Sequence, residues 1–311
     1  MKKYLLIFAS LLLAACLGCE KQPVSETPSE QPISDGTESA APSFVFTPDN
    51  YPRMGGSLAN LPLGEAVTAT VLGIDRAAAD GMITFAGSTT DNYKAIVDGG
   101  FDILLAYEPS EEAKAYIEEK GAALEMTPIG ADALVFICHK DNPVTSLSTD
   151  EIKSIYRGEI DNWKTLGGED MTLTPFQRNT DSGSQTLFDK LVGLGDDLMD
   201  APQEYRIGSM IGLLEAVADY DDSDGALGYT VYYYLTNMEK EKLDRCKILD
   251  VDGVTPTNDA ISDKSYPYVN DFYVVIRADE PEDSPARILY NWICSDEGLS
   301  LVEKENYPVI R

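Results

Sequence analysis

From Phe44 to the C-terminus, short apolar runs alternate with segments in which apolar residues recur every three or four positions. Short runs rich in β-branched and aromatic residues are typical of buried strands. They predict strands at residues 44–46, 82–85, 102–107, 134–138 and 171–176.

Helices are predicted between these runs. Tyr93, Ile96 and Val97 would share one helix face, and Gly99 and Gly100 would end that helix. The same spacing predicts helices at 111–120, with Ser110 as N-cap, at 149–156, and along a stripe formed by Leu187, Phe188, Leu191 and Val192. Strand and helix alternate throughout, which predicts an α/β protein with largely parallel sheets.

The N-terminus follows a different pattern. A basic start precedes an apolar run at residues 4–15, which is too short to cross about 30 Å of hydrocarbon and therefore favours a removable signal peptide. The run closes on LAAC, which resembles the lipobox of bacterial lipoproteins and implies a signal peptide at 1–15 and acylation of Cys16. Cys19 is a weaker second candidate, and an ordinary secretory signal is the alternative.

Residues 16–43 are rich in Pro, Ser, Thr and Glu and contain few apolar residues. Such a segment cannot bury enough apolar surface to fold, so it is predicted to be a disordered acidic tether. No later stretch is apolar for about eighteen residues, and the sequence predicts no other membrane-spanning segment.

Composition excludes several classes of function. The chain has 311 residues, 24 Lys and Arg against 53 Asp and Glu, and a formal net charge of −29, which disfavours nucleic acids and acidic membrane surfaces as partners. His139 is the one histidine, so multi-histidine metal sites and a Ser-His-Asp triad are disfavoured. The cysteines beyond residue 19 form no CxxC pair, which argues against zinc and thioredoxin-like sites. The acidic turn at 219–225 does not fit a calcium-binding loop.

Three predicted helices begin with glycine and small hydroxyl residues. These starts are residues 55–58 (GGSL), 87–90 (GSTT) and 178–184 (RNTDSGS). The first amides of a helix have no intrahelical acceptor, and the helix dipole favours negative charge there. One such start is equally well explained as an ordinary N-cap, but three in one chain predict an anion site.

Two charged residues end predicted strands near these helix starts. Arg178 has a planar fork that suits a tetrahedral oxyanion, although a surface ion pair with Asp181 is the alternative. Glu108 ends the strand at 102–107, where its carboxylate could accept a proton from monohydrogen or dihydrogen phosphate and repel sulfate. Alternatively, Glu108 simply precedes the next helix beside Pro109.

A family resemblance is carried by the segments MGGSLANLPLG, STTDNYKAIVDGGFDILLAYEPSEE, PIGADALVFICHKDNPV, EIKSIYRGEIDNWKTLGG and FQRNTDSGSQTLF. From about Phe44 onward, the chain resembles the phosphate-binding substrate-binding proteins of ABC transporters, the PstS-like group. The resemblance implies a set of phosphate ligands: Ser57 and the amide of Leu58, Thr89 or Thr90, Glu108, and Arg178, Ser182, Gly183 and Ser184. Two positions depart from the family pattern, because Leu58 stands where a threonine is frequent and Glu108 stands where the best-known members have aspartate.

The resemblance also implies a type II periplasmic-binding-protein fold, in which two α/β lobes enclose a ligand cleft. Lobe 1 is expected at 44–131 and 266–311, and lobe 2 at 132–265. The chain would cross between the lobes near 129–134 and again near 266–273. Closure of the lobes would bury the ligand.

The function implied is capture of inorganic phosphate outside the cell and its delivery to an ABC permease. The protein is expected to be a monomer on the outer face of the cytoplasmic membrane, held by its lipid alone, without catalysis, cofactor or metal. The alternatives are a binding protein for sulfate, molybdate or tungstate, an envelope phosphatase, and a surface interaction protein that retains the fold without a ligand.

Overall fold

The computed structural model describes residues 44–219 and 225–309. The predicted signal peptide (1–15), Cys16 and the tether (16–43) lie outside these residues, and so does the centre of the acidic turn at 219–225. Chain contacts separate Met1–Phe44 from Val45–Arg311, and the second unit is the folded body described below.

Within the described residues, eight strands form one mixed sheet in the order β2-β1-β3-β12-β4-β9-β6, with β10 beside β4. Their bounds are β1 (Met54–Gly56), β2 (Ile83–Thr84), β3 (Ile103–Ala106), β4 (Leu124–His139), β6 (Thr174–Pro175), β9 (Ala226–Val231), β10 (Cys246–Ile248) and β12 (Val269–Arg277). Two further pairs, β5 (Ser146–Leu147) with β11 (Asp250–Val251) and β7 (Gln177–Arg178) with β8 (Arg206–Ile207), form small separate sheets.

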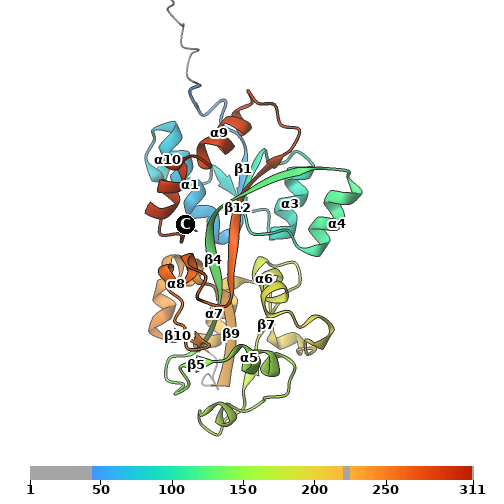
Figure 1. Ribbon diagram of the computed structural model, residues 1–311, viewed down its shortest axis with the longest axis vertical. Helices are drawn as coiled ribbons and strands as arrows, with labels where there is room; N and C mark the ends of the chain where they lie inside the picture. The colour runs from blue at the N-terminus through green and yellow to red at the C-terminus, as the bar shows by residue number, and fades with distance from the viewer. Residues whose placement is uncertain (1–43, 220–224, 310–311) are drawn as a thin grey trace, which may run out of the picture. The chain divides into compact units, whose positions relative to one another are not determined.

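Helices cover the sheet on both sides of the two longest strands (Figure 1). The α-helices are α1 (Leu61–Leu72), α2 (Arg76–Ala79), α3 (Thr89–Val97), α4 (Glu111–Glu119), α5 (Thr149–Tyr156), α6 (Gly183–Val192), α7 (Met210–Asp219), α8 (Asn258–Ser262), α9 (Pro285–Ile293) and α10 (Asp296–Lys304). Short 3₁₀ or π segments include η1 (Leu58–Asn60), η2 (Trp163–Leu166), η3 (Gly195–Asp197), η4 (Gln203–Tyr205), η6 (Tyr234–Met238) and η7 (Lys240–Asp244).

The strands β4 and β12 run from one lobe of the body into the other and connect the two (Figure 1). β4 pairs with β12 over Leu124–Ala133 and then with β9 over Leu134–Cys138. We call the part built on β1, β2 and β3 with α1, α3, α4, α9 and α10 the first lobe, and the part built on β6, β9 and β10 with α5, α6 and α7 the second lobe. The residue boundaries expected from the sequence stay predictions.

The expectation of largely parallel sheets is wrong for the main sheet, whereas both small sheets, β5–β11 and β7–β8, are parallel. Only β1–β2, β1–β3 and β6–β9 are parallel within the main sheet, whereas β12 pairs antiparallel with β3 and β4, and β4 pairs antiparallel with β9 and β10. The reason is that the chain leaves the first lobe along β4 and returns along β12, so the two connecting strands run in opposite directions.

The expected strand at 44–46 is also wrong. Phe44 and Val45 are exposed, and residues 44–46 do not form a strand. The place in the sheet is taken by β1, whose glycines allow a close approach: a β-carbon on Gly55 would lie 2.5 Å from the Phe101 ring and 2.8 Å from Leu104. The strand therefore forms at the segment that can pack closely against its neighbours, and not at the segment with the higher β-propensity.

Other local predictions are confirmed. α5 spans Thr149–Tyr156, and Ser148 and Glu151 form a capping box at its start. Ser110 caps α4 by accepting a hydrogen bond from Ala113 N–H. The expected strand at 171–176 is shorter than predicted, because only Thr174–Pro175 pairs with β9.

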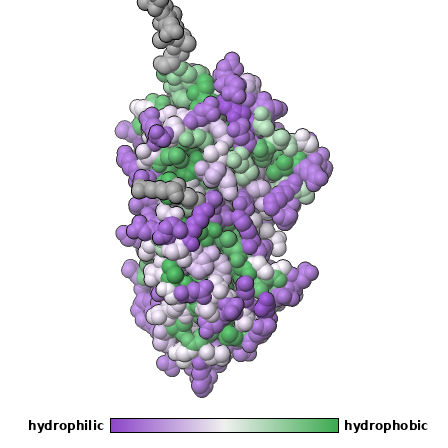
Figure 2. All heavy atoms as spheres, in the orientation of Figure 1, coloured by the Kyte–Doolittle hydropathy of each residue, from purple (hydrophilic) through white to green (hydrophobic). Residues whose placement is uncertain are grey.

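The core is continuous along β4 from one lobe to the other. In the second lobe it centres on Phe136, whose ring centroid lies 5.6–6.5 Å from those of Tyr156, Phe188, Tyr229 and Tyr268. Hydrophilic residues cover much of the face drawn in Figure 2, with smaller hydrophobic areas between them. Among the described residues, no helix combines the length and apolar character needed to cross a membrane.

Replacement of Phe136 tests this core. Phe136→Ala should lower the free energy of unfolding in urea by about 3–5 kcal/mol, because a fully buried ring is lost from a packed cluster. Val45→Ala is the matched control: Val45 is 68% exposed, and its truncation should change the free energy by less than about 0.5 kcal/mol. Equal effects of the two substitutions would contradict this description of the core.

Candidate functional site

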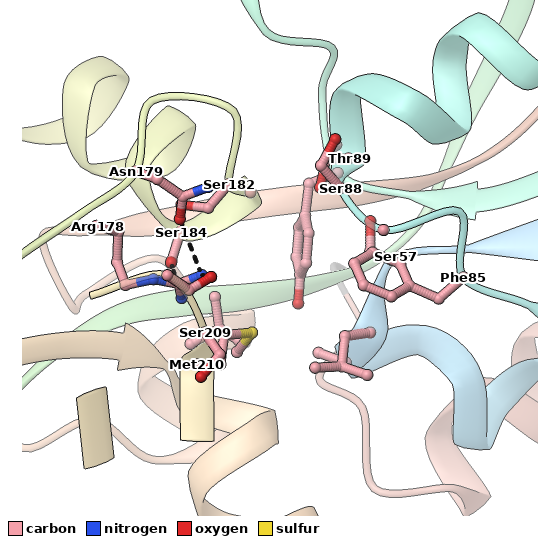
Figure 3. A pocket seen from close by; sticks show the side chains of 17 residues that line it. Ser57, Phe85, Ser88, Thr89, Arg178, Asn179, Ser182, Ser184, Ser209 and Met210 are labelled. Atoms are coloured by element: carbon pink, nitrogen blue, oxygen red, sulfur yellow. Dashed lines mark hydrogen bonds between the residues drawn. The ribbon is translucent and has the colours of Figure 1, made fainter. Parts of the chain in front are cut away.

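A cavity of about 140 Å³ lies where the two lobes face each other (Figure 3). The first lobe and the second lobe both contribute to its wall. The lining residues are Ser57, Leu58, Ala59, Phe85, Gly87, Ser88, Thr89 and Tyr107, together with Arg178, Asn179, Ser182, Gly183, Ser184, Gly208, Ser209, Met210 and Val231. All three helix starts that the sequence analysis singled out therefore share one cavity.

The first helix start follows β1. Ser57 N–H donates to Leu105 O at 2.9 Å, which fixes the loop against β3. The Ser57 hydroxyl is buried, lines the cavity and has no hydrogen-bond partner among the described residues. A buried hydroxyl without a partner costs free energy, so this position favours a ligand that can bond to it.

The second helix start is that of α3. Ser88 Oγ accepts from Asp91 N–H at 3.0 Å and donates to Asp91 Oδ2 at 2.9 Å, which caps the helix. Thr89, the first helical residue, lines the cavity. Thr90 does not: its hydroxyl lies 2.7 Å from Ser110 Oγ, inside the first lobe. Of the two threonines that the sequence left open, the structure brings only Thr89 to the cavity.

Arg178 provides the charge of the site. It ends β7 and is 7% exposed. Its guanidinium donates from Nε to Ile207 O at 2.9 Å, from Nη1 to Ser184 Oγ at 3.0 Å, and from Nη2 to Gly208 O at 3.4 Å and Asn179 Oδ1 at 3.5 Å. All four acceptors are neutral.

The electrostatic consequence is a buried positive charge that Asp181 compensates only from beyond ion-pair distance. Among the described residues, no carboxylate forms an ion pair with Arg178, and burial lowers the pKa of its guanidinium. A surface ion pair between Arg178 and Asp181 was the alternative drawn from the sequence. It does not form, because Arg178 is buried and Asp181 accepts a hydrogen bond from Asn179 instead. A buried cation at helix N-termini favours an anion.

A buried network holds the Arg178 backbone from behind. Arg178 N–H donates to Gln185 Oε1 at 3.1 Å and to the Tyr229 hydroxyl at 3.0 Å. Tyr229 in turn donates to Gln185 Oε1, and Gln185 Nε2 donates to Asp189 Oδ1 at 2.7 Å. The α6 helix therefore positions the guanidinium as well as presenting its own N-terminus.

The N-terminus of α6 also comes close to the first lobe. Ser182 caps the helix by accepting from Gln185 N–H at 3.1 Å, and Gly183 and Ser184 follow as the first helical residues. A β-carbon on Gly183 would lie 2.6 Å from Thr89 Oγ1. Any larger residue at this position would require the Thr89 hydroxyl to move, so glycine suits this close approach of the two lobes.

Glu108 is not brought into the cavity. Its Oε1 accepts from Lys190 Nζ at 2.7 Å and from the Tyr273 hydroxyl at 3.0 Å, and it lines a different hollow. Lys190 also donates to Asn270 Oδ1 at 2.8 Å. Burial is the largest single influence on Glu108 and opposes its ionisation, but the bond to Lys190, the charge of Lys190 and the bond to Tyr273 together lower the pKa of the carboxyl. The arrangement does not support Glu108 as a ligand residue, because its carboxylate is engaged by a cation outside the cavity.

The neighbouring residue Tyr107 lines the cavity instead, and the sequence analysis missed it. Its hydroxyl donates to Asp132 Oδ2 at 2.7 Å. Asp132 Oδ1 accepts from the amides of Ala133 at 2.8 Å and Tyr233 at 3.0 Å. Burial raises the pKa of Asp132 to about 6. This network joins the cavity wall to β4 at the junction of the two lobes.

A fourth helix start was also missed. Gly208 and Ser209 precede α7, and Ser209 Oγ accepts from Gly212 N–H at 3.1 Å. Ser209 and Met210 line the cavity beside Arg178 (Figure 3). The signal was present in the sequence, because Gly-Ser before a helix is the same pattern as at the three predicted starts.

The described residues contain no group of three or more His, Cys, Asp or Glu side chains arranged to hold a metal ion. Cys138 and Cys246 are buried free thiols away from the cavity, and Cys294 is partly buried. The chemistry that the cavity offers is hydrogen bonding by hydroxyls and amides around one guanidinium.

The Asp132 network predicts a pH dependence of stability. Because the folded pKa of about 6 lies above the ordinary value of 3.8, folding favours the protonated carboxyl, and this contribution is lost as pH rises through about 4 to 6. The free energy of unfolding in urea should be measured for the wild type and for Asp132→Asn. The difference between the two proteins should change by up to about 3 kcal/mol between pH 4 and pH 7, because the wild type loses stability over this range. Parallel stability curves for the two proteins would show that Asp132 does not titrate in this range.

Comparison with known proteins agrees with this geometry. The chain is 29% identical over 173 residues to the phosphate-binding protein PstS of Bacillus subtilis (strain 168), covering 56% of this chain and 51% of the relative. It is 26% identical over 219 residues to PstS of Staphylococcus haemolyticus (strain JCSC1435), covering 68% and 67%. The first match thus spans about half the length of that relative.

Solved structures show the same architecture. A phosphate ABC transporter substrate-binding protein of Clostridium perfringens, with phosphate bound, superimposes with a TM-score of 0.65 at 26% identity, covering 83% of this chain and 98% of that one. An ABC-type phosphate transport receptor of Vibrio cholerae, with a TM-score of 0.60 at 20% identity over 83% and 99% of the two chains, shares the fold. The PBP superfamily domain matches residues 73–297, which is more than half of the sequence. The chain therefore belongs to the PBP superfamily, within which it resembles the PstS-like phosphate-binding proteins.

Proposed function

We propose that this protein captures inorganic phosphate outside the cell and delivers it to an ABC permease, without catalysing a reaction. The observation that carries the proposal is the buried Arg178, whose guanidinium contacts only neutral acceptors and faces a cavity lined by helix N-termini. The named function of the relatives and the phosphate in the Clostridium perfringens structure support the same ligand.

The proposed ligand residues are those that line the cavity. Arg178 and the hydroxyls of Ser182 and Ser184, with the amides of Gly183 and Ser184, bind from the second lobe. Ser57, the amide of Leu58 and Thr89 bind from the first lobe. Thr90 and Glu108 are left out of the set, because each is engaged elsewhere.

We also propose that the mature protein begins at an acylated Cys16 and is held at the outer face of the cytoplasmic membrane by its lipid. The LAAC sequence after an apolar run of twelve residues supports this location. The tether would then give the folded body, a monomer, room to reach the permease.

The central test is calorimetric titration of Arg178→Ala with phosphate. The wild type should bind one phosphate per chain, and the variant should bind about 30- to 5,000-fold more weakly, because loss of a buried charge partner costs about 2–5 kcal/mol. Arg178→Lys, which keeps the charge but loses the fork, should fall between the two. Circular dichroism shows whether each variant is folded, and a folded Arg178→Ala protein with wild-type affinity would place the site elsewhere.

The selectivity for phosphate over sulfate tests whether Glu108 is correctly left out of the set of ligand residues. Glu108→Gln should leave the ratio of phosphate to sulfate affinity unchanged, because the carboxylate contacts Lys190 and Tyr273 rather than the cavity. Competition titrations measure the ratio directly. A variant that binds sulfate and phosphate equally, beside a selective wild type, would return Glu108 to the site.

Lipidation is tested by metabolic labelling with radioactive palmitate. Cys16→Ser should abolish incorporation of the label and release the protein from the membrane fraction, whereas Cys19→Ser should incorporate label normally. Loss of label in the Cys19 variant alone would move the acylation site to that residue.

A further inference from the structure

One ion pair joins the two lobes. Glu108 follows β3 in the first lobe and Lys190 lies on α6 in the second, and Glu108 Oε1 accepts from Lys190 Nζ at 2.7 Å. The other ion pairs of the described residues lie within one lobe or involve β12. This pair therefore depends on how the lobes are placed relative to each other.

Both partners also bond to β12, one of the two strands that connect the lobes (Figure 1). Glu108 Oε1 accepts from the Tyr273 hydroxyl at 3.0 Å, and Lys190 Nζ donates to Asn270 Oδ1 at 2.8 Å. Asn270 is buried, and the side chains of Glu108 and Lys190 are 29% and 45% exposed. Because these bonds hold both ends in place and shield them in part from water, the pair is stronger than a fully exposed one.

The α6 helix links Lys190 to the cavity. Gly183 and Ser184 begin this helix and line the cavity, and Lys190 follows two turns later, roughly 10 Å along the axis. Two turns of hydrogen-bonded helix move as one body. A displacement of the α6 N-terminus away from the first lobe therefore also displaces Lys190 from Glu108.

The other end of the pair is tied to α3. Glu108 follows Tyr107, whose carbonyl accepts from the Tyr93 hydroxyl at 2.7 Å. Tyr93 belongs to α3, and the first residue of that helix, Thr89, lines the cavity. The ion pair and the close approach of Gly183 to Thr89 thus depend on the same relative position of the lobes.

A bond that forms only when the lobes are close stabilises that arrangement. Separation of the lobes by a few ångströms breaks a hydrogen bond of ordinary length. The affinity for an anion held between the lobes includes the free energy of bringing them together, so such a bond raises the affinity without touching the anion. For the same reason it cannot distinguish one anion from another.

We infer that the ion pair of Glu108 with Lys190 is a clasp that holds the lobes together around a bound anion and slows its release, an inference that rests on the phosphate site proposed above. Glu108 and Lys190 are positioning residues, because neither lines the cavity. The clasp raises the affinity for phosphate and for sulfate by the same factor.

Glu108→Gln distinguishes a clasp from a general effect of charge. In a chain of net charge −29, removal of a carboxylate should by itself favour an anion, whereas loss of the clasp weakens its binding. Calorimetric titration of the full-length protein with phosphate should give a dissociation constant about 3- to 10-fold above that of the wild type. Release of radiolabelled phosphate into excess unlabelled phosphate, followed by rapid mixing, should be faster by a similar factor.

Lys190→Met breaks the same bond from the other lobe and should have a similar effect on affinity and release. The double variant Glu108→Gln, Lys190→Met should bind phosphate no more weakly than the weaker of the two single variants, because one bond is lost in all three proteins. Losses that add in the double variant would show that the two residues act independently, and would overturn the clasp.

Glu111→Gln is the matched control. Glu111 lines the same hollow as Glu108 and pairs with Lys114 at 2.7 Å within α4, so its loss removes an equal charge without affecting the contact between the lobes. Its affinity and release rate should stay within about twofold of the wild type. Equal effects in the Glu111 and Glu108 variants, or a folded Glu108→Gln protein that binds as tightly as the wild type, would overturn the clasp and leave phosphate capture standing. A wild type that does not bind phosphate would overturn the proposed function itself.

Discussion

The site depends on a guanidinium that is buried without an ion pair to any residue in the described part of the chain. Burial of an ion costs several kcal/mol even when its hydrogen bonds are satisfied, and the acceptors of Arg178 are neutral carbonyl and side-chain oxygens. The helix starts around it add positive potential rather than negative. Without an anion, the guanidinium and the helix starts form an unfavourable arrangement of like-signed groups, which a bound anion would make favourable. Bonds to Ile207 O and Ser184 Oγ hold the guanidinium in this position, and the network of Gln185 and Tyr229 holds the Arg178 backbone.

The parts of the site that could be predicted from sequence are local. Ser57, Thr89, Arg178 and Ser182 to Ser184 all belong to strand-to-helix junctions, where a few adjacent residues determine both the cap and the free amides. Ser209 follows the same local rule and could have been found in the same way. By contrast, Phe85 and Val231 carry no pattern of their own, since their place in the wall is set by how the lobes face each other.

Local sequence patterns do not show which way a side chain points at the end of a strand. They also do not show which distant strands pair. Tyr107 and Glu108 are adjacent, and successive side chains of an extended segment point to opposite sides, so a strand end identifies the position but not which residue faces the ligand. Similarly, the alternation of strands and helices indicated an α/β fold correctly but said nothing of β4 and β12, whose antiparallel pairing joins residues more than a hundred positions apart.

The contact between Thr89 and Gly183 bears on how an anion would enter and leave the cavity. The hydroxyl and the backbone come from opposite lobes and leave no room for even a methyl group between them. An anion cannot pass between the lobes at this point, so any passage along this part of the rim requires the two lobes to separate. Release of a bound anion by that route would then be limited by the rate at which the lobes part.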